Sequence, residues 1–266
     1  MAKHSNDLDG ASWARNSISV WSDLRKSREE AALGHPALFP MALASRLIEC
    51  FSKAGERVVL DPFAGAGSAP LAAMRMGGKG IGLELSAEFV RIAKRRAGQL
   101  SMEDGEVVFH RADARRLKKF VAPESVDLVI TSPPYWDILL QRRSADGKAP
   151  RNYGKTARDL GKIADYQQFL AALEEVFGQV HQALKPGKYC CVVVMDLRKK
   201  DKFFPLHADL AERMKGLGFI FDDLIIWDRR QEYNNLRPLG YPSVFRINKI
   251  HEFILIFRKT KLRVEG

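Results

Sequence analysis

Short apolar runs alternate with segments of helical periodicity along this chain, and that alternation limits its fold more than any other feature of the sequence. Such a pattern predicts an α/β architecture with mostly parallel strands. Helices are expected on both faces of the sheet, because each parallel connection has to cross over it. The seven expected strands occupy residues 57–61, 80–84, 106–110, 126–131, 189–195, 219–227 and 251–257.

The helical segments carry start and stop signals. Helices are expected after Pro36 and from Ser86, which is a suitable N-cap. The sequence Lys185-Pro-Gly187 is typical of a helix end. The remaining helices are expected at residues 68–76, 166–184 and 205–215.

The 266 residues suit one elaborated domain with an ample core. A polar N-terminal arm is expected at residues 1–34, and the domain itself at 35–266. Regular patterning lapses in a loop rich in Lys and Arg at 137–165, and again in a polar loop at 228–250. Long loops in compact domains are often functional, so both loops are candidates for binding.

Composition narrows the class of protein. Lys and Arg number 43 against 32 Asp and Glu, a net charge of +11 that favours a polyanionic partner. No apolar run approaches the ~20 residues that cross a bilayer, and the N-terminus lacks the apolar region of a signal peptide. Three cysteines cannot form a disulfide framework, and no Cys/His cluster has metal-ligand spacing. We therefore expect a cytoplasmic protein without a membrane anchor or a bound metal.

The first candidate binding site is the segment Asp61-Pro-Phe-Ala-Gly-Ala-Gly67, where a strand passes into a helix. Open α/β sheets bind ligands at such points, and Gly65 and Gly67 let the backbone approach a ligand closely. Pro70 stands where a dinucleotide fingerprint has Gly or Ala, and no Lys-Ser/Thr pair of a P-loop follows. An ordinary tight turn is the alternative.

Two acidic residues follow the next two strands of the expected sheet. Glu84 is positioned to accept hydrogen bonds from both hydroxyls of a ribose, or it is an ordinary carboxylate at a helix start. Asp113 can lie over the same sheet edge and accept a hydrogen bond from an exocyclic amine. Alternatively, Asp113 pairs with a neighbouring arginine: Arg111, Arg115 or Arg116.

The sharpest signal is Thr131-Ser-Pro-Pro-Tyr-Trp136, at the end of the fourth expected strand. Its two prolines fix the backbone and remove two N–H donors, which leaves carbonyl groups as acceptors. Ser132 adds a hydroxyl that can accept, and Tyr135 and Trp136 add flat faces for stacking. Such a turn can hold a planar base by its amino group, with a purely structural turn as the alternative.

Together these two segments resemble the amino-group DNA methyltransferases, which transfer a methyl group from S-adenosylmethionine to cytosine N4 or adenine N6. The resemblance covers most of the chain, and the pair of motifs is more specific than either one alone. It implies a Rossmann-like class I methyltransferase fold, with residues 35–266 as the catalytic domain. Many relatives with the serine motif place it before the cofactor turn, whereas here the cofactor turn comes first.

By this resemblance, S-adenosylmethionine is the cofactor, with its methionine end on the glycine segment, its ribose at Glu84 and its adenine at Asp113. The segment from His35 to Pro40 would close over it. The implied cofactor residues are His35, Phe39, Pro40, Asp61, Phe63, Gly65, Gly67, Glu84 and Asp113. The implied catalytic pocket, in which Tyr135 stacks on the target base, consists of Ser132, Pro133, Pro134 and Tyr135.

Relatives with the serine form of the motif are mostly associated with cytosine N4. We therefore expect a site-specific DNA methyltransferase that acts on N4 of a flipped cytosine, because a stacked base is inaccessible. Adenine N6 in DNA, an amino group in RNA, and a nucleic-acid-binding subunit without turnover are the alternatives. Methylation at cytosine C5 would need a cysteine nucleophile, but the three thiols are all predicted to lie in the core: Cys50, Cys190 and Cys191.

A duplex DNA partner requires positive charge near the base pocket. The basic loop at 137–165 follows the catalytic motif directly, and the loop at 228–250 has amides and arginines suited to base edges. These loops are the candidate target-recognition elements, with a merely solvated loop as the alternative for the first. The candidate DNA contacts are Trp136, Arg142, Arg143, Arg151, Lys155, Arg229, Arg230 and Arg237.

Overall fold

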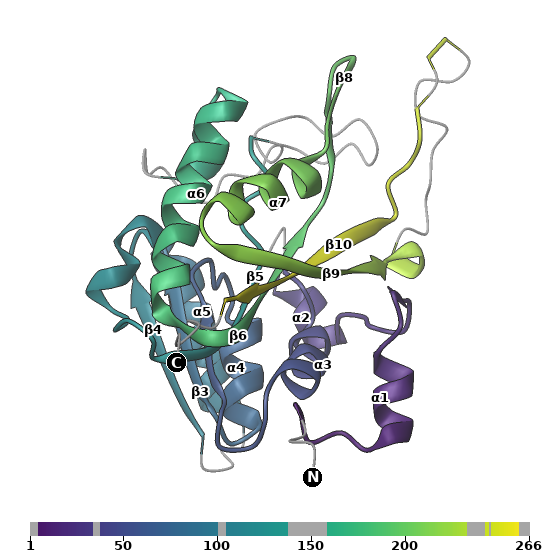
Figure 1. Cartoon of the computed structure of the whole chain (residues 1–266). Coiled ribbons are helices and arrows are strands. Elements are labelled where there is room, and N and C mark those ends of the chain that lie inside the picture. Colours follow the sequence, from purple (N-terminus) through teal and green to yellow (C-terminus); the bar gives the residue numbers. More distant parts are fainter. Residues whose placement is uncertain are drawn as a thin grey trace, which may run out of the picture.

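The structure, a computed structural model, describes residues 5–33, 38–100, 105–137, 159–232, 243–244 and 246–260. One large sheet dominates it, with the strand order β1-β9-β10-β6-β5-β2-β3-β4 (Figure 1). All neighbouring strands pair in parallel except β10, which is antiparallel to both β6 and β9. The strands are β1 Val20–Trp21, β2 Val58–Asp61, β3 Lys79–Glu84, β4 Glu106–Arg111, β5 Val126–Thr131, β6 Leu184–Val194, β9 Phe219–Asp228 and β10 His251–Lys259.

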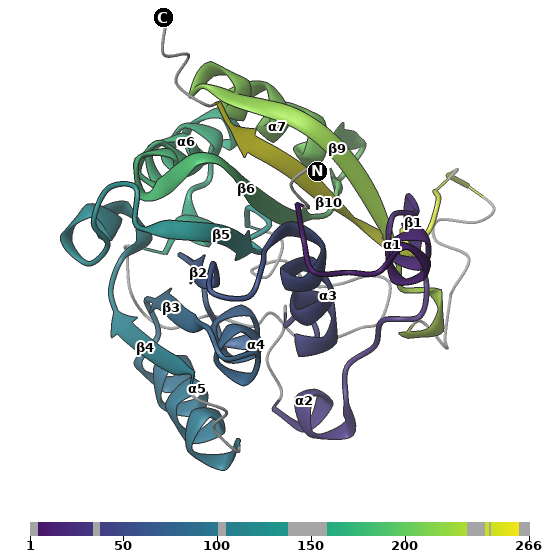
Figure 2. The ribbon, with the colours of Figure 1, turned by 60° about the horizontal axis from the view of Figure 1, so that its bottom comes forward.

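The helices cover both faces of this sheet, as the sequence predicts. Figure 2 shows α3, α4 and α5 on one side of the sheet and α6 and α7 on the other. Their bounds, with those of the N-terminal helices, are α1 Gly10–Asn16, α2 Arg28–Ala32, α3 Met41–Phe51, α4 Ser68–Arg75, α5 Ala87–Gln99, α6 Tyr166–Ala183 and α7 Leu206–Gly216. The described residues also form the short 3-10 helices η1 Ala114–Lys119, η3 Leu160–Lys162 and η4 Arg230–Glu232. A separate hairpin pairs β7 Leu197–Lys199 with β8 Lys202–Phe204.

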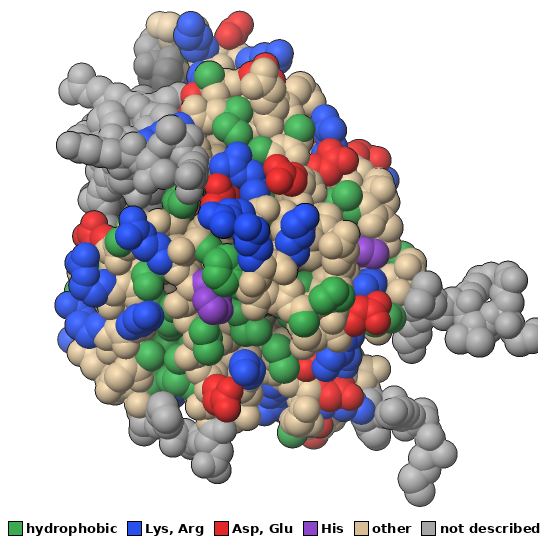
Figure 3. Space-filling view, turned by 90° about the vertical axis from the view of Figure 1, so that its left-hand side faces the viewer, with side chains coloured by type: hydrophobic (Ala, Val, Ile, Leu, Met, Phe, Trp, Pro, Cys, Tyr) green, Lys and Arg blue, Asp and Glu red, His purple; other side chains and the backbone are tan. Residues whose placement is uncertain are grey.

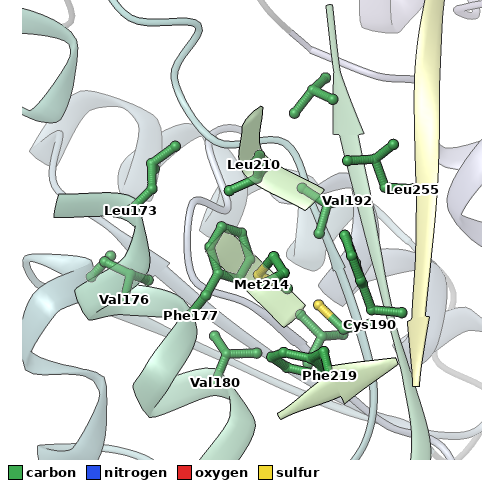
Figure 4. Close-up of a cluster of buried hydrophobic side chains, with 14 of the residues drawn as sticks. Leu173, Val176, Phe177, Val180, Cys190, Val192, Leu210, Met214, Phe219 and Leu255 are labelled. Carbon is green, nitrogen blue, oxygen red and sulfur yellow. The ribbon is translucent and has the colours of Figure 1, made fainter. Parts of the chain in front are cut away.

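Strand β6 shows why the central strands are apolar at every position. Cys190 and Val192 face the core beneath α6 and α7, whereas Cys191 and Val193 between and beyond them face the core beneath α3 and α4. Both faces of a strand are buried in such a sheet, so the sequence shows a continuous apolar run rather than an alternating one. In the first core, β6 and β10 pack against side chains of α6 and α7 (Figure 4), among them Leu173, Val176, Phe177, Val180, Leu210 and Met214.

The expected α/β fold is confirmed, with two corrections. The sheet has eight strands rather than seven, because Val20–Trp21 of the N-terminal segment pairs in parallel with β9. Helix α6 does end at Ala183, but the chain passes directly into β6 instead of a loop. The pairing register shifts between Val126 and Leu128 of β5, which accommodates Pro186 and Gly187 as an irregularity within the strand.

The N-terminal segment is packed against the sheet. Trp21 is only 1% exposed, and its indole N–H donates to the carbonyl of Asn16. The indole N–H of Trp227 in β9 donates in turn to the carbonyl of Leu24 at 3.1 Å. Residues described as a polar arm by composition alone therefore contribute large side chains to the core beneath α3.

Chain order fixes where a ligand can bind. From β2 the chain continues to β3 and β4 on one side, whereas β5 and β6 lie on the other side of β2. Ligands of open α/β sheets bind at the carboxyl ends of the strands where the order reverses in this way. Here that point lies between β2, which ends at Asp61, and β5, which ends at Thr131.

Candidate active site

The glycine turn connects β2 to α4 through two left-handed residues. Gly65 has φ of +51° and Gly67 has φ of +89°, a region that favours glycine. A Cβ atom on Gly67 would lie 2.8 Å from Cζ of Phe109 in β4. Gly67 is therefore required twice, by its backbone angle and by the ring that presses on the turn.

Asp61 lies at the base of this turn and is completely buried. Its Oδ1 accepts hydrogen bonds from Thr131 Oγ1 at 2.6 Å and from the amide of Phe63 at 3.0 Å. Burial raises the pKa of Asp61 to about 7, against these hydrogen bonds. Among the described residues, its Oδ2 has no hydrogen-bond partner, and neither has the buried hydroxyl of Ser68 at the start of α4.

Glu84, at the end of β3, ties the next strand to the same turn. Its Oε2 accepts from the amide of Gly65 at 2.9 Å, and its Oε1 accepts from the amide of Ser86 at 2.6 Å. The side chain is 9% exposed, and this burial raises the pKa of Glu84 above its ordinary value. Ser86 caps α5, as its sequence position predicts.

Asp113 forms the ion pair that was the alternative interpretation of its position. Its carboxylate takes two side-chain hydrogen bonds from Arg115, at 2.7 and 3.0 Å, and also accepts from the backbone amide of Arg115. Asp113 caps η1 in this way. The ion pair does not remove the residue from the site, because Asp113 also lines the pocket described next.

A single pocket brings the separate motifs together at the carboxyl edge of the sheet. Its walls come from the ends of β2, β3, β4 and β5 and from the segment before α3. The expected site residues that line it are Phe39, Phe63, Gly65, Glu84, Asp113, Ser132, Pro133 and Pro134. The lining does not include Asp61, Gly67, Pro40 or Tyr135, and His35 lies outside the described residues.

The Ser-Pro-Pro-Tyr turn presents Ser132 to this pocket, and the hydroxyl of Tyr135 contacts both Ser132 and a carboxylate of β10. The hydroxyl oxygens of Ser132 and Tyr135 are 3.0 Å apart. The Tyr135 hydroxyl donates to Oε2 of Glu252 at 2.8 Å, and Glu252 is 4% exposed. Burial and the negative charge of Glu252 raise the pKa of Tyr135 well above its ordinary value.

The structure corrects the prediction that Trp136 contacts DNA. We expected it to offer a flat face to DNA, but it is 6% exposed. Its indole N–H donates to the carbonyl of Ile163 at 2.8 Å, and its ring packs against Tyr166 and Phe204 at centroid distances of 5.1 and 4.9 Å. An apolar ring with a satisfied N–H is more stable in this cluster than in water.

The structure also corrects the prediction that Arg229 contacts DNA. We expected a DNA contact, but its guanidinium is 15% exposed and forms ion pairs with Glu252 and Glu232. Arg230 is 70% exposed and pairs with Asp228 at 3.3 Å, so it can still reach a partner. The remaining expected DNA contacts lie outside the described residues: Arg142, Arg143, Arg151, Lys155 and Arg237.

The three thiols are buried, as expected for core cysteines. Burial raises the pKa of Cys50 to about 12 and raises the pKa values of Cys190 and Cys191 as well. These thiols stay protonated and unreactive at neutral pH. Within the described ranges, no group of three or more His, Cys, Asp or Glu side chains could hold a metal ion. No helix there is long and apolar enough to span a membrane.

The sequence profile of the DNA methylase family matches residues 3–95 and 126–264. The chain belongs to the DNA methylase family. The type II methyltransferase M.MjaI of Methanocaldococcus jannaschii is 29% identical to it over 169 residues, which cover 57% of this chain and 55% of that protein. The DNA adenine methyltransferase YhdJ of Escherichia coli strain K12 is 40% identical over 62 residues, 23% of this chain and 21% of that one.

The crystal structure of TrmN from Thermus thermophilus shares the fold of this chain. It aligns with a TM-score of 0.52 at 17% identity, over 85% of this chain and 51% of TrmN. The expected Rossmann-like fold, a mostly parallel sheet with helices on both faces, is thereby confirmed. The chain spans about half the length of M.MjaI.

The sequence motifs do not include two carboxylates of this site. Asp159 lines the pocket, caps η3, and lies near enough to Glu84 for its charge to contribute to the raised pKa there. Glu252 holds the Tyr135 hydroxyl from β10. Asp159 has a weak sequence signal, an Asp before a short helical turn, whereas Glu252 has none beyond being a charge within an apolar strand.

Proposed function

We propose that this DNA methylase transfers a methyl group from S-adenosylmethionine to the exocyclic N4 of a cytosine that is flipped out of duplex DNA. The observation that carries this proposal is the shared pocket. It is lined both by the glycine turn with its ribose-type acceptor Glu84 and by Ser132 and Pro133 of the catalytic turn. A methyl donor and an acceptor base have to meet in one cavity for direct transfer.

The residues present suit the cofactor. An amino acid end carries an ammonium group, and Oδ2 of Asp61 and Oγ of Ser68 are buried acceptors without a partner among the described residues. We assign the methionine end to Asp61, Phe63, Gly65, Gly67 and Ser68, and the ribose hydroxyls to Glu84. Asp113 takes the adenine amine, while His35, Phe39 and Pro40 cover the cofactor.

The catalytic turn acts on the target amine. The lone pair of an exocyclic amine is delocalised into the ring, which makes the nitrogen a poor nucleophile. Hydrogen bonds from the amine to Ser132 Oγ and to the carbonyl of Pro133 draw the nitrogen toward a tetrahedral shape and localise that pair. The cofactor, when bound, supplies a methyl group on a positively charged sulfur. Serine is too weak a base to remove the proton first, so the proton leaves after transfer, when the methylated nitrogen is acidic.

Pro134 fixes the turn, and the ring of Tyr135 stacks on the extruded base. The basic loop at 137–165, with Arg142, Arg143, Arg151 and Lys155, and the polar loop at 228–250 contact the DNA. A second candidate function is methylation of adenine N6. It is favoured by the 40% identity of 62 residues to the DNA adenine methyltransferase YhdJ, and the same acceptors can hold either amine.

The test is the identity of the methylated nucleoside. The protein is incubated with tritiated S-adenosylmethionine and duplex DNA, and the DNA is digested to nucleosides. Label in N4-methylcytosine is the expected result, and label in N6-methyladenine supports the second candidate instead. The Ser132→Ala variant serves as the control, because it keeps the cofactor site and should lose most of the label. Absence of label in either nucleoside, with duplex DNA and with RNA, overturns the proposed function.

A further inference from the structure

A chain of hydrogen bonds runs from the catalytic serine to a buried ion pair. Ser132 lies 3.0 Å from the hydroxyl of Tyr135, which donates to Oε2 of Glu252 at 2.8 Å. Oε1 of Glu252 accepts from Arg229, whose other terminal nitrogen pairs with Glu232 at 2.6 Å. Glu252 is 4% exposed and Arg229 15%, so the pair is shielded from water. The methyl transfer proposed above gives no role to these hydrogen bonds.

The guanidinium of Arg229 sets the direction of every hydrogen bond between it and Ser132. The guanidinium of Arg229 can only donate, so Glu252 is held as an acceptor. Tyr135 has one hydroxyl proton, which it donates in the hydrogen bond to Glu252. The oxygen of Tyr135 can then only accept from Ser132, which commits the proton of the serine to Tyr135. Both lone pairs of Ser132 Oγ are left for a donor in the pocket.

We propose that Glu252, fixed by Arg229, is a positioning residue that orients Ser132 through Tyr135 as a hydrogen-bond acceptor for the target amine. The inference rests on the proposed function, since it concerns the same amine. A serine free to rotate would spend part of its time pointing its proton at the amine, where a donor is useless. Because burial and Glu252 raise the pKa of Tyr135, the phenol keeps the proton that this arrangement needs.

The decisive variant is Glu252→Gln, which preserves shape and reverses the chain. Arg229 can pair only with the carbonyl oxygen of the new amide, so the amide NH2 group faces Tyr135. Tyr135 then donates to Ser132, and the serine proton points into the pocket. We expect kcat for methyl transfer to fall at least tenfold, while the dissociation constant of S-adenosylmethionine changes less than twofold.

A double-mutant cycle separates positioning from a merely structural role. Tyr135→Phe removes the acceptor of the Ser132 proton and leaves the ion pair in place, so it tests the same bond even if Glu252→Gln folds poorly. If both changes act through one bond, the double variant has nearly the kcat of the worse single variant. Multiplying losses, or a kcat of Glu252→Gln within twofold of the wild type, would overturn the inference.

Asp127→Asn is the matched control for burial. Asp127 is 2% exposed, accepts from Lys185 at 2.7 Å, and lies at the opposite end of β5 from the catalytic turn. Its variant should lose stability and keep kcat within twofold. A second readout avoids activity: the 13Cζ signal of labelled Tyr135 should titrate at lower pH in Glu252→Gln, with Arg229 still beside it. A wild type that methylates nothing refutes the proposed function, whereas an active wild type with an unaffected variant refutes only the positioning role.

A second surface carries an independent inference. The hairpin of β7 and β8 projects past α7 at the top of Figure 1. Its sequence between Leu197 and Phe204 holds four Lys and Arg and one Asp, and Arg198, Lys200 and Lys202 are exposed. Phe203 at 43% exposure lies beneath the guanidinium of Arg198 at 5.6 Å and the ammonium of Lys249 at 5.1 Å.

The base of this hairpin is bonded to the catalytic segment. Lys199 forms an ion pair with Asp137 at 2.5 Å, and its ammonium lies 4.2 Å from the ring centroid of Trp136. Phe204 packs on the same ring. We infer that the hairpin docks on the phosphate backbone of duplex DNA while the target base enters the pocket. This inference also rests on the proposed function, because it names the surface that grips the same substrate.

The test is the salt dependence of DNA binding by the full chain. Each phosphate contact by a cation contributes about 0.9 to the slope of log affinity against log salt concentration. The triple variant Arg198→Gln, Lys200→Gln, Lys202→Gln should flatten the slope by about 2 to 3 for a duplex of mixed sequence. The matched control is Arg91→Gln, Lys94→Gln, Arg95→Gln on the exposed face of α5, which should leave the slope unchanged.

An unchanged slope in the hairpin variant, or equal flattening in both variants, overturns this inference. If the wild type shows no salt-dependent affinity for duplex DNA at all, the proposed substrate fails along with it. Retention of S-adenosylmethionine binding in the triple variant shows that the pocket is intact.

Discussion

At the scale of single residues, the site depends on carboxylates whose surroundings differ. Asp61 is fully buried, and one of its oxygens has no partner in the described part of the chain. Glu84 is held by two backbone amides, and Asp113 is neutralised by Arg115. Glu252 is buried with an ion pair and a phenol. The carboxylate therefore serves as a buried acceptor at Asp61, as a rigid acceptor at Glu84 and as a positioning group at Glu252. The surroundings of each side chain determine its role.

Asp61 predicts a dependence of stability on pH. The unfolded carboxyl ionises near 3.8, whereas burial raises the pKa in the folded chain to about 7. The folded state thus binds more protons between these values, and its stability falls as pH rises through that window. Relative to Asp61→Asn, the wild type should lose about 3–4 kcal/mol between pH 4 and pH 8. Urea denaturation of both proteins at each pH measures it, and parallel pH profiles would contradict it.

The same residue predicts the pH dependence of cofactor binding. An ammonium group pairs with the ionised carboxylate, so the affinity of the wild type for S-adenosylmethionine should rise as pH increases through about 7. In Asp61→Asn the affinity should be weaker and nearly flat between pH 6 and pH 8. Isothermal titration calorimetry at the two pH values distinguishes the proteins. A wild-type affinity that does not change would separate Asp61 from the cofactor.

At the scale of elements, strand ends and turns position the site, and backbone conformation decides which residues they tolerate. The turn from β2 to α4 needs two left-handed residues, and one of them, Gly67, lies against Phe109 of β4. The turn after β5 needs prolines that fix its carbonyl groups. The irregular start of β6 shows the opposite case, because Pro186 and Gly187 are absorbed within a strand without serving the site.

Two glycine-to-alanine changes test this difference. Gly67→Ala places a Cβ at a φ of +89° and 2.8 Å from the Phe109 ring, so it should destabilise the fold by more than 1 kcal/mol and weaken cofactor binding. Gly98→Ala, in α5 with no atom within 4 Å of the new Cβ, should be stabilising by up to about 1 kcal/mol. Denaturant midpoints measure both. Equal effects at the two positions would mean that the turn is not strained by a side chain.

The eighth strand predicts that the N-terminal segment contributes to stability. Trp21 is 1% exposed in the core beneath α3, whereas Trp13 in α1 is 43% exposed. Trp21→Ala should cost about 3–5 kcal/mol through the cavity it leaves. Trp13→Ala should change stability by less than about 1 kcal/mol. Similar losses in thermal or urea denaturation for the two variants would contradict the placement of β1 in the sheet.

At the scale of the whole molecule, the net charge of +11 is spread widely. On the face in Figure 3, Lys and Arg side chains lie across the surface with Asp and Glu among them. Total charge steers the molecule toward a polyanion, but only cations near the pocket can fix a base in it. The contacts that hold the DNA with its target base in the pocket therefore have to come from segments beside the catalytic turn.

We expect the basic loop at 137–165 to contribute measurably to the affinity for DNA. Neutralising Arg142 and Arg143, with both changed to Gln, should flatten the salt dependence of duplex DNA binding by up to about 2 in slope. Cofactor affinity should stay the same. Fluorescence anisotropy over a series of KCl concentrations measures the slope, and the triple change on α5 again provides the control. A slope equal to that of the wild type would remove the loop from the interface.

Much of this protein follows from local chemistry and so was predictable from the sequence. Strand and helix periodicity, the N-cap at Ser86, and the glycine and Ser-Pro-Pro turns all depend on neighbours within a few residues. Parallel strands then bring their carboxyl ends to one edge, which is why the residues of both turns could be assigned to one pocket before it was seen.

Only the tertiary structure decided which side chains face that pocket and which support it. Trp136 and Arg229 carry the right chemistry for DNA, yet residues 27 and 23 positions along the chain, Ile163 and Glu252, hold them inside. Glu252 became part of the site because β10 inserts antiparallel between β6 and β9, a placement that no local pattern specifies. Burial and pairing are properties of contacts between distant segments, so they emerge only when the sheet closes around them.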